Sequence, residues 1–240
     1  MLLKPKNKAE FVSQIMALPP EQRKVVVLAG RHLNEGSRNI AVRNHLAWGK
    51  HGAVTVLIPV AWTPHGFWRE MEKTAKAKGT TVKKLFYTVK KRADKVPLDE
   101  NLIALLERAG VGASVVNLHG HPGNSRPWLS LFVQQEAPAH VKKTVTSLKH
   151  TYIGRELTLT YEQGPRSITQ HPREILVEYE FSGKPHSTKT VLGARLYTGQ
   201  VAHVYLKSPR ITRDELKEFE GKHLPKLSYL IQLLARTHHE

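Results

Sequence analysis

The chain of 240 residues contains no cysteine. This absence excludes a disulfide framework, a thiolate zinc site and a cysteine nucleophile. Any transition-metal site must therefore be built from His, Asp and Glu, and histidine is abundant, with 14 residues.

Long apolar runs are also missing. No uninterrupted apolar stretch reaches the roughly 18 residues that a membrane-spanning helix needs, so we expect no membrane span. The basic residues 1–8 are followed by a segment, 11–18, that is too short and too polar for the apolar part of a signal peptide, and Pro19-Pro20 ends it. We therefore expect a cytoplasmic protein.

Acidic residues are scarce: 20 Asp and Glu stand against 37 Lys and Arg, a formal net charge of +17. Such a charge attracts anions, whether nucleic acid, an acidic surface or a carboxylate-rich substrate. The basic residues form short groups on predicted helices, such as 83–84, 90–92 and 142–143, and no long basic tail exists. We therefore favour an anionic small-molecule or peptide substrate, with nucleic-acid binding as the alternative.

Short apolar, β-branched segments alternate with helical patterns along the chain. Strands are predicted at residues 25–29, 53–62, 113–118, 129–133 and 175–181. A C-terminal helix is predicted at 212–237, begun by a capping box of Thr212 and Glu215. The pattern indicates a single α/β domain over 1–240, with a mixed, mainly parallel sheet and helices on both faces. In such sheets ligands bind beyond the carboxyl ends of the strands.

Polar residues follow two of these predicted strands. His32 and Glu35 come after the first strand, three residues apart, so one helical turn can direct both toward one ion. His119 follows the third strand and is a candidate third ligand, with His121 as its alternative. A catalytic zinc site uses three protein ligands of these types. Taken singly, each motif is equally typical of a polar loop or of a histidine bonded to backbone.

The two motifs together resemble those of the zinc carboxypeptidase-like superfamily, including the succinylglutamate desuccinylase/aspartoacylase branch. His32-x-x-Glu35 resembles its first zinc motif, and Asn117-Leu118-His119-Gly120 resembles its Asp-Leu-His motif. Between them, Pro59–Phe67 is similar to the Pro-x-x-Asn-Pro-x-Gly-Phe stretch. Asn117 stands where the family usually has Asp, and Trp62-Thr63 stands where Asn is expected. The resemblance covers residues 25–122.

The resemblance implies a zinc-dependent hydrolase that cleaves an amide or peptide bond next to a carboxylate-bearing group. Zinc would be held by His32, Glu35 and His119. The family's general base is a glutamate on a late strand, and Glu178 and Glu180 lie two apart on one face of the predicted strand 175–181. Glu180 is preferred, because the Phe-Ser-Gly that follows it is closer to the family's strand ending; Glu178 is the alternative. The competing interpretation is an edge strand with a solvated acidic face.

An arginine usually assists such a site, by polarising the scissile carbonyl or by binding a substrate carboxylate. Arg69 is the first candidate for both roles, and Arg126 is the second for substrate binding. Two other functions stay open: a basic, nucleic-acid-associated protein on a hydrolase-like scaffold, and a metal-binding relative without catalysis. The sequence specifies neither the scissile bond nor the oligomeric state.

Overall fold

A computed structural model of the chain describes a defined set of residues: 1–30, 36–59, 62, 64–81, 84–85, 102–122, 129–152, 156–163, 169, 171–181 and 212–238. Within these ranges the backbone alone is described for residues 64–69, 121–122 and 181.

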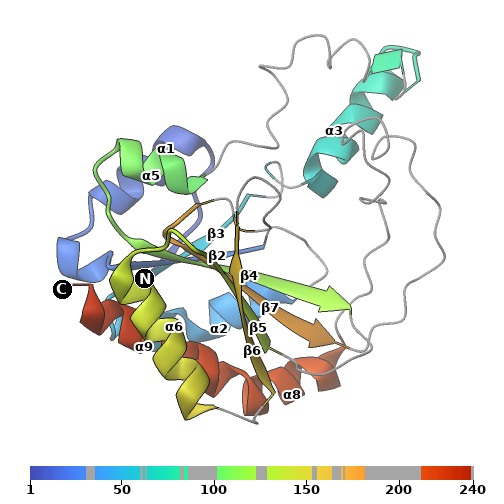
Figure 1. Cartoon of the computed structure of the whole chain (residues 1–240). Helices are drawn as coiled ribbons and strands as arrows, with labels where there is room; N and C mark the ends of the chain where they lie inside the picture. The colour runs from blue at the N-terminus through green and yellow to red at the C-terminus, as the bar shows by residue number, and fades with distance from the viewer. Residues whose placement is uncertain are drawn as a thin grey trace.

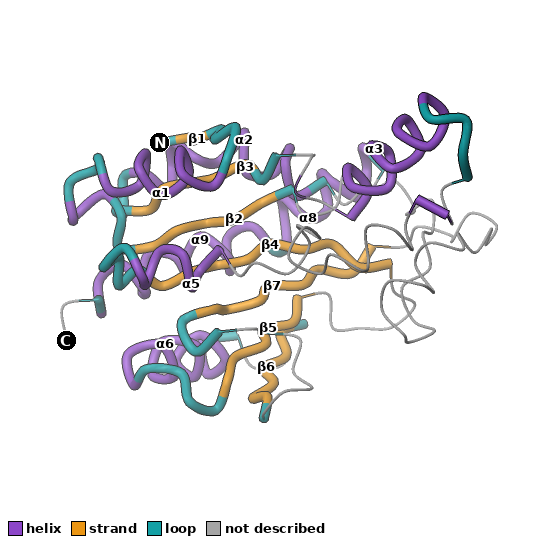
Figure 2. The backbone as a smooth tube through the Cα atoms, turned by 90° about the horizontal axis from the view of Figure 1, so that it is seen from above, coloured by secondary structure: helices purple, strands orange, loops and turns teal. Residues whose placement is uncertain are grey.

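The described part of the chain forms a seven-stranded sheet in the order β1-β3-β2-β4-β7-β5-β6 (Figure 2). The strands are β1 (Leu2–Leu3), β2 (Val25–Ala29), β3 (Ala53–Leu57), β4 (Ser114–Pro122), β5 (Leu129–Gln134), β6 (Leu157–Glu162) and β7 (Glu174–Phe181). Strands β1, β3, β2, β4 and β7 run parallel, β5 pairs antiparallel with β7, and β6 pairs parallel with β5. The predicted α/β fold with a mixed, mainly parallel sheet is confirmed.

Helices cover both faces of this sheet (Figure 1). One face, called here the α6/α9 face, is covered by α2 (Ser37–Gly49), α6 (Ala139–Thr151), α8 (Arg213–Lys222) and α9 (Leu224–Thr237). The other, the α1/α5 face, packs against α1 (Lys8–Met16) and α5 (Leu102–Arg108). The remaining described helices are η1 (Pro20–Gln22) and α3 (Pro64–Ala77). Among the described residues, none of the helices combines the length and apolarity required to cross a bilayer.

Alternation along the strands decides which side chains enter each core. On β2 both faces are apolar: Val25, Val27 and Ala29 join the α6/α9 core, while Val26 and Leu28 join the α1/α5 core. Each such valine is fully buried, which stabilises the fold by about 1.5–3 kcal/mol relative to exposure.

Strand β7 is different, because only one of its faces is fully apolar. Its residues Ile175, Val177 and Tyr179 pack into the α6/α9 core. Its carboxylates therefore lie on the opposite, α1/α5 face. The fold thus places a polar surface on one side of a strand whose other side is core.

Three predicted boundaries were wrong. The predicted strand 53–62 ends at Leu57, two residues before Pro59, whose ring nitrogen cannot donate to a ladder. The predicted strand 113–118 extends to Pro122. The single helix predicted at 212–237 is two helices that meet at His223, because Pro225 in the first turn of α9 has no N–H to continue α8. The capping box of Thr212 and Glu215 is present as predicted.

Candidate functional site

The carboxyl ends of β2, β4 and β7 lie next to one another at one edge of the sheet. Ala29 of β2 pairs with Leu118 of β4, and His119 of β4 pairs with Glu178 of β7. His119 therefore lies inside β4 and not in a loop after a strand, as the sequence had suggested. Since Val116 and Leu118 face the α6/α9 core, His119 and Asn117 lie on the α1/α5 face.

A buried chain of hydrogen bonds orients His119. Nδ2 of Asn117 donates to Oε1 of Glu174 at 2.8 Å, and Oδ1 of Asn117 lies 3.1 Å from Nε2 of His119. The three residues are 4%, 5% and 8% exposed in the order Glu174, Asn117, His119. An amide oxygen can only accept, so Nε2 of His119 carries the proton and donates. In the neutral ring the lone pair is consequently at Nδ1, which is the nitrogen able to bind a metal.

Both candidate bases lie beside this histidine on the same face. Glu178 is the direct neighbour of His119 on the adjacent strand, and Glu180 is the neighbour of His121. Glu178 also pairs with Ser130 on β5, and Ser130 accepts a 2.8 Å hydrogen bond from Thr158 on β6. A polar row therefore crosses four strands at the level of His119.

Glu180 differs from Glu178 in one respect. Its Oε2 atom is buried and accepts no hydrogen bond from the described residues. Strand β7 lies between β4 and β5 in the sheet, so the edge-strand interpretation of its acidic face is wrong. Both glutamates are half-buried, which is the environment of residues inside a site and not of a solvated edge.

The first turn of α2 closes on the ends of β2 and β3. Oγ of Ser37 accepts a 3.1 Å hydrogen bond from the Gly30 N–H, and Nη1 of Arg38 donates to the Ile58 carbonyl at 2.6 Å. Gly30 has a φ of +93°, and a Cβ there would lie 2.7 Å from Cγ of Arg38. Partial burial lowers the pKa of Arg38 below its usual value. This guanidinium is a cation held at the carboxyl edge of the sheet.

Several predicted residues fall outside the described side chains. His32, Glu35 and Arg126 lie outside the described residues altogether. Arg69 lies on α3 and His121 on β4, but only their backbones are described. Among the side chains that are described, no three from His, Asp and Glu come together as a metal site. The predicted ligand set therefore stays a prediction, of which the structure describes His119.

One departure from the family pattern has a structural explanation. Trp62, which stands where Asn is expected, packs edge-on against Phe11 of α1, with ring centroids 6.4 Å apart. It belongs to the α1/α5 core as a partly buried residue. Trp62 therefore has a packing role in this chain.

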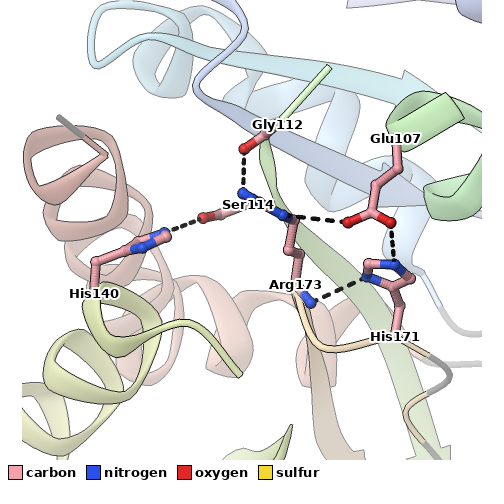
Figure 3. A network of polar contacts seen from close by, with 6 residues as sticks. All are labelled: Glu107, Gly112, Ser114, His140, His171 and Arg173. Carbon is pink, nitrogen blue, oxygen red and sulfur yellow. Dashed lines mark hydrogen bonds and ion pairs between the residues drawn. The ribbon is translucent and has the colours of Figure 1, made fainter. Parts of the chain in front are cut away.

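A second polar cluster lies at the opposite, amino-terminal edge of β4 and β7 (Figure 3). Nδ1 of His171 accepts from the Arg173 N–H at 3.1 Å, so its Nε2 carries the proton and donates to Oε2 of Glu107 at 2.8 Å. Ser114 lies 3.2 Å from Nε2 of His140, and burial, with the charge of Arg173, lowers the pKa of that histidine. The cluster joins α5, β4 and α6, and contributes no side chain to the carboxyl edge.

Two residues of the candidate site were not predicted from the sequence: Glu174 at the start of β7 and Arg38 in the first turn of α2. Arg38 lies three residues after Glu35, and this proximity to the first motif was the available signal. Glu174 had no local signal, because its contact with Asn117 depends on the pairing of β4 with β7.

No protein-family model matches the chain, and no curated protein matches it. Solved structures similar to it include two amidases. The N-acetylmuramoyl-L-alanine amidase AmiC2 of Nostoc punctiforme shares 12% identity at a TM-score of 0.36, over 91% of this chain and 96% of that one. The CwlD amidase from Clostridioides difficile, in complex with the GerS lipoprotein, shares 10% identity at a TM-score of 0.37, over 90% of this chain and 98% of that one. Neither likeness assigns the chain to a family.

Proposed function

We propose that the chain is a zinc-dependent hydrolase that cleaves an amide or peptide bond next to a carboxylate-bearing group. The observation that carries the proposal is the arrangement at the carboxyl end of β4 and β7. There an imidazole with its lone pair at Nδ1 lies beside two carboxylates on one face of the sheet. These groups together are a metal ligand and two candidate proton acceptors.

Two of the described residues support the proposed zinc site. His119 offers a neutral nitrogen ligand, and the unsatisfied Oε2 of Glu180 shows that an acceptor is kept without a structural partner among the described residues. The proposal takes the other two ligands to be His32 and Glu35. Their segment leaves β2 at Gly30, beside the β4 position of His119, and returns at Gly36.

The residues of the chain have separate tasks in this mechanism. Bound zinc supplies a Lewis acid and lowers the pKa of a water molecule to about 7. Glu180 accepts the proton of the attacking water at Oε2 and returns it to the leaving amine. Arg38 binds the anionic group of the substrate, since its planar guanidinium keeps donors beyond the one bonded to Ile58. Arg69 and Arg126 stay candidates for the same task.

Metal analysis tests the zinc site. Purified protein should contain about one zinc per chain, and His119→Ala and His32→Ala should each lose it. His150→Ala is the matched control, because His150 is an exposed histidine in the last turn of α6. Zinc retained in full by both site variants would contradict the assignment.

Hydrolysis of N-acyl amino acids and short peptides tests the base. Glu180→Gln should keep zinc and lose hydrolysis by about 100-fold or more, whereas Glu178→Gln should lose less. The opposite order would assign the base to Glu178. Zinc binding with no hydrolysis of any substrate in the wild type would instead identify a metal-binding relative without catalysis.

A further inference from the structure

Glu174 is a buried carboxylate that the proposed reaction does not use. It begins β7, four residues before Glu178, so about 13 Å of strand separates the two. Removing a carboxylate from water is costly unless the group is hydrogen-bonded, and Glu174 is 4% exposed. Its hydrogen bond from Asn117 is therefore an interaction on which its burial depends.

The carboxylate of Glu174 determines which way the amide of Asn117 faces, and the amide in turn determines which group His119 meets. An ionised carboxylate can only accept hydrogen bonds, so the NH₂ of Asn117 must face Glu174. The carbonyl of the same amide then faces His119 and accepts from Nε2. An amide turned the other way would place two acceptors, its carbonyl oxygen and the carboxylate of Glu174, against each other.

We propose that Glu174 is a positioning residue that acts through Asn117 to hold His119 in one ring orientation, with the proton on Nε2 and Nδ1 presented to a metal. The metal part of this inference rests on the proposed function, whereas the tautomer is a property of the metal-free chain. Histidines that bind metals are commonly oriented by a carboxylate partner on the other ring nitrogen. Here the carboxylate does not contact the ring directly. Asn117 lies between them and fixes the ring orientation through its own hydrogen bond to His119.

We call the hydrogen-bonded series Glu174–Asn117–His119 the relay. Exchanging the carboxylate of Glu174 and the amide of Asn117 tests it. Glu174→Gln can offer either its oxygen or its NH₂ to Asn117, so His119 should populate both tautomers. Asn117→Asp places a second carboxylate against Glu174 and should weaken zinc binding through repulsion. In the double variant Asn117→Asp/Glu174→Gln, the new carboxylate accepts from His119 and the new amide donates to it, so a single Nε2–H tautomer should return.

The primary measurement is the ¹⁵N NMR spectrum of the histidine side chains in the metal-free full-length protein. The second is zinc affinity, expected to fall 10- to 100-fold in Glu174→Gln and to recover in the double variant. Ser114→Ala is the matched control, because it removes a part-buried hydrogen bond at the other end of the same strand. It should leave the His119 signals and the zinc affinity unchanged.

Two results would overturn the inference: an unchanged His119 tautomer in Glu174→Gln, or a double variant whose zinc affinity is no closer to wild type than that of Asn117→Asp. If Asn117→Asp does not fold, the comparison of Glu174→Gln with wild type decides alone. A wild-type chain that binds no zinc would remove the proposed function, while the tautomer measurement would still decide whether the relay exists.

Discussion

Substituting Gly30 by alanine should destabilise the chain more than the same change at another glycine of positive φ. Gly30 and Gly110 have φ values of +93° and +75°. A Cβ at Gly110 meets nothing within 4 Å, whereas a Cβ at Gly30 lies 2.7 Å from Cγ and 2.8 Å from Nη1 of Arg38. Alanine therefore has a similar backbone cost at Gly30 and at Gly110, and only at Gly30 does its Cβ also clash with Arg38.

The magnitudes can be estimated separately. A left-handed conformation costs a non-glycine residue about 1–2 kcal/mol, partly offset by the lower entropy of the unfolded chain. Gly110→Ala should therefore lower the free energy of unfolding by about 1 kcal/mol. Gly30→Ala also displaces Arg38 from the Ile58 carbonyl, a charged hydrogen bond that contributes about 1.5 kcal/mol. Its total cost should be about 2.5 kcal/mol.

Urea denaturation of a double-mutant cycle measures this coupling. In an Arg38→Ala background the clash is absent, so the cost of Gly30→Ala should drop to that of Gly110→Ala, a coupling of about 1.5 kcal/mol. Equal costs of Gly30→Ala in the two backgrounds would refute the packing of Arg38 over Gly30. Because Gly30 begins the segment that carries His32 and Glu35, the same variant should also weaken zinc binding.

Three further changes have defined outcomes. Burial, with Lys226 and Lys222 nearby, lowers the pKa of His223 from 6.5 to about 4; below pH 6.5 the unfolded chain binds a proton that the folded chain does not. As the pH is lowered from 6.5 to about 4, the free energy of unfolding should thus fall by about 2 kcal/mol, a value discounted for solvent screening. Urea denaturation of His223→Gln over the same pH range should not show this decrease. Leu118→Ala should cost about 3 kcal/mol in urea denaturation, because Leu118 is fully buried, whereas Leu46→Ala, at 69% exposure, should change stability by less than about 0.5 kcal/mol. Arg38→Met should lower kcat/KM about tenfold for substrates with a free carboxylate and spare their amides. The control is Arg23→Met, because Arg23 is a half-buried arginine that donates to the Met16 carbonyl, away from the carboxyl edge of the sheet. Equal losses of kcat/KM on both classes of substrate would contradict anion binding by Arg38.

Local patterns predicted the parts of the fold that local chemistry determines. Strand β2 has the predicted bounds of 25–29, because a short β-branched apolar run between Lys24 and Gly30 leaves little choice of register. The capping box at Thr212 likewise involves residues three apart. The break at His223 was missed because the apolar period continues through it, although Pro225 could have indicated it.

The candidate site was predicted less completely, because its contacts join distant parts of the chain. The motifs at His119 and Glu178 were identified, but which glutamate lies beside the histidine follows from the pairing of β4 with β7. The contact between Asn117 and Glu174 spans 57 residues of sequence and has no local pattern. His32 and Glu35 lie outside the described residues, so their part in the site stays a prediction.

The core and the candidate site use opposite faces of the same two strands, so the register that stabilises one also assembles the other. A shift of one residue in the pairing of β7 with β4 would move Val177 out of the α6/α9 core and turn Glu178 into it. Burying an unpaired carboxylate there would cost several kcal/mol, in addition to the loss of a fully buried valine. The apolar face therefore selects the register, and the register sets Glu178 beside His119 and keeps Asn117 within reach of Glu174. Substitution of Val177, the buried valine of β7, should consequently disturb the His119 tautomer as well as stability, although Val177 faces the α6/α9 core on the opposite side of the sheet.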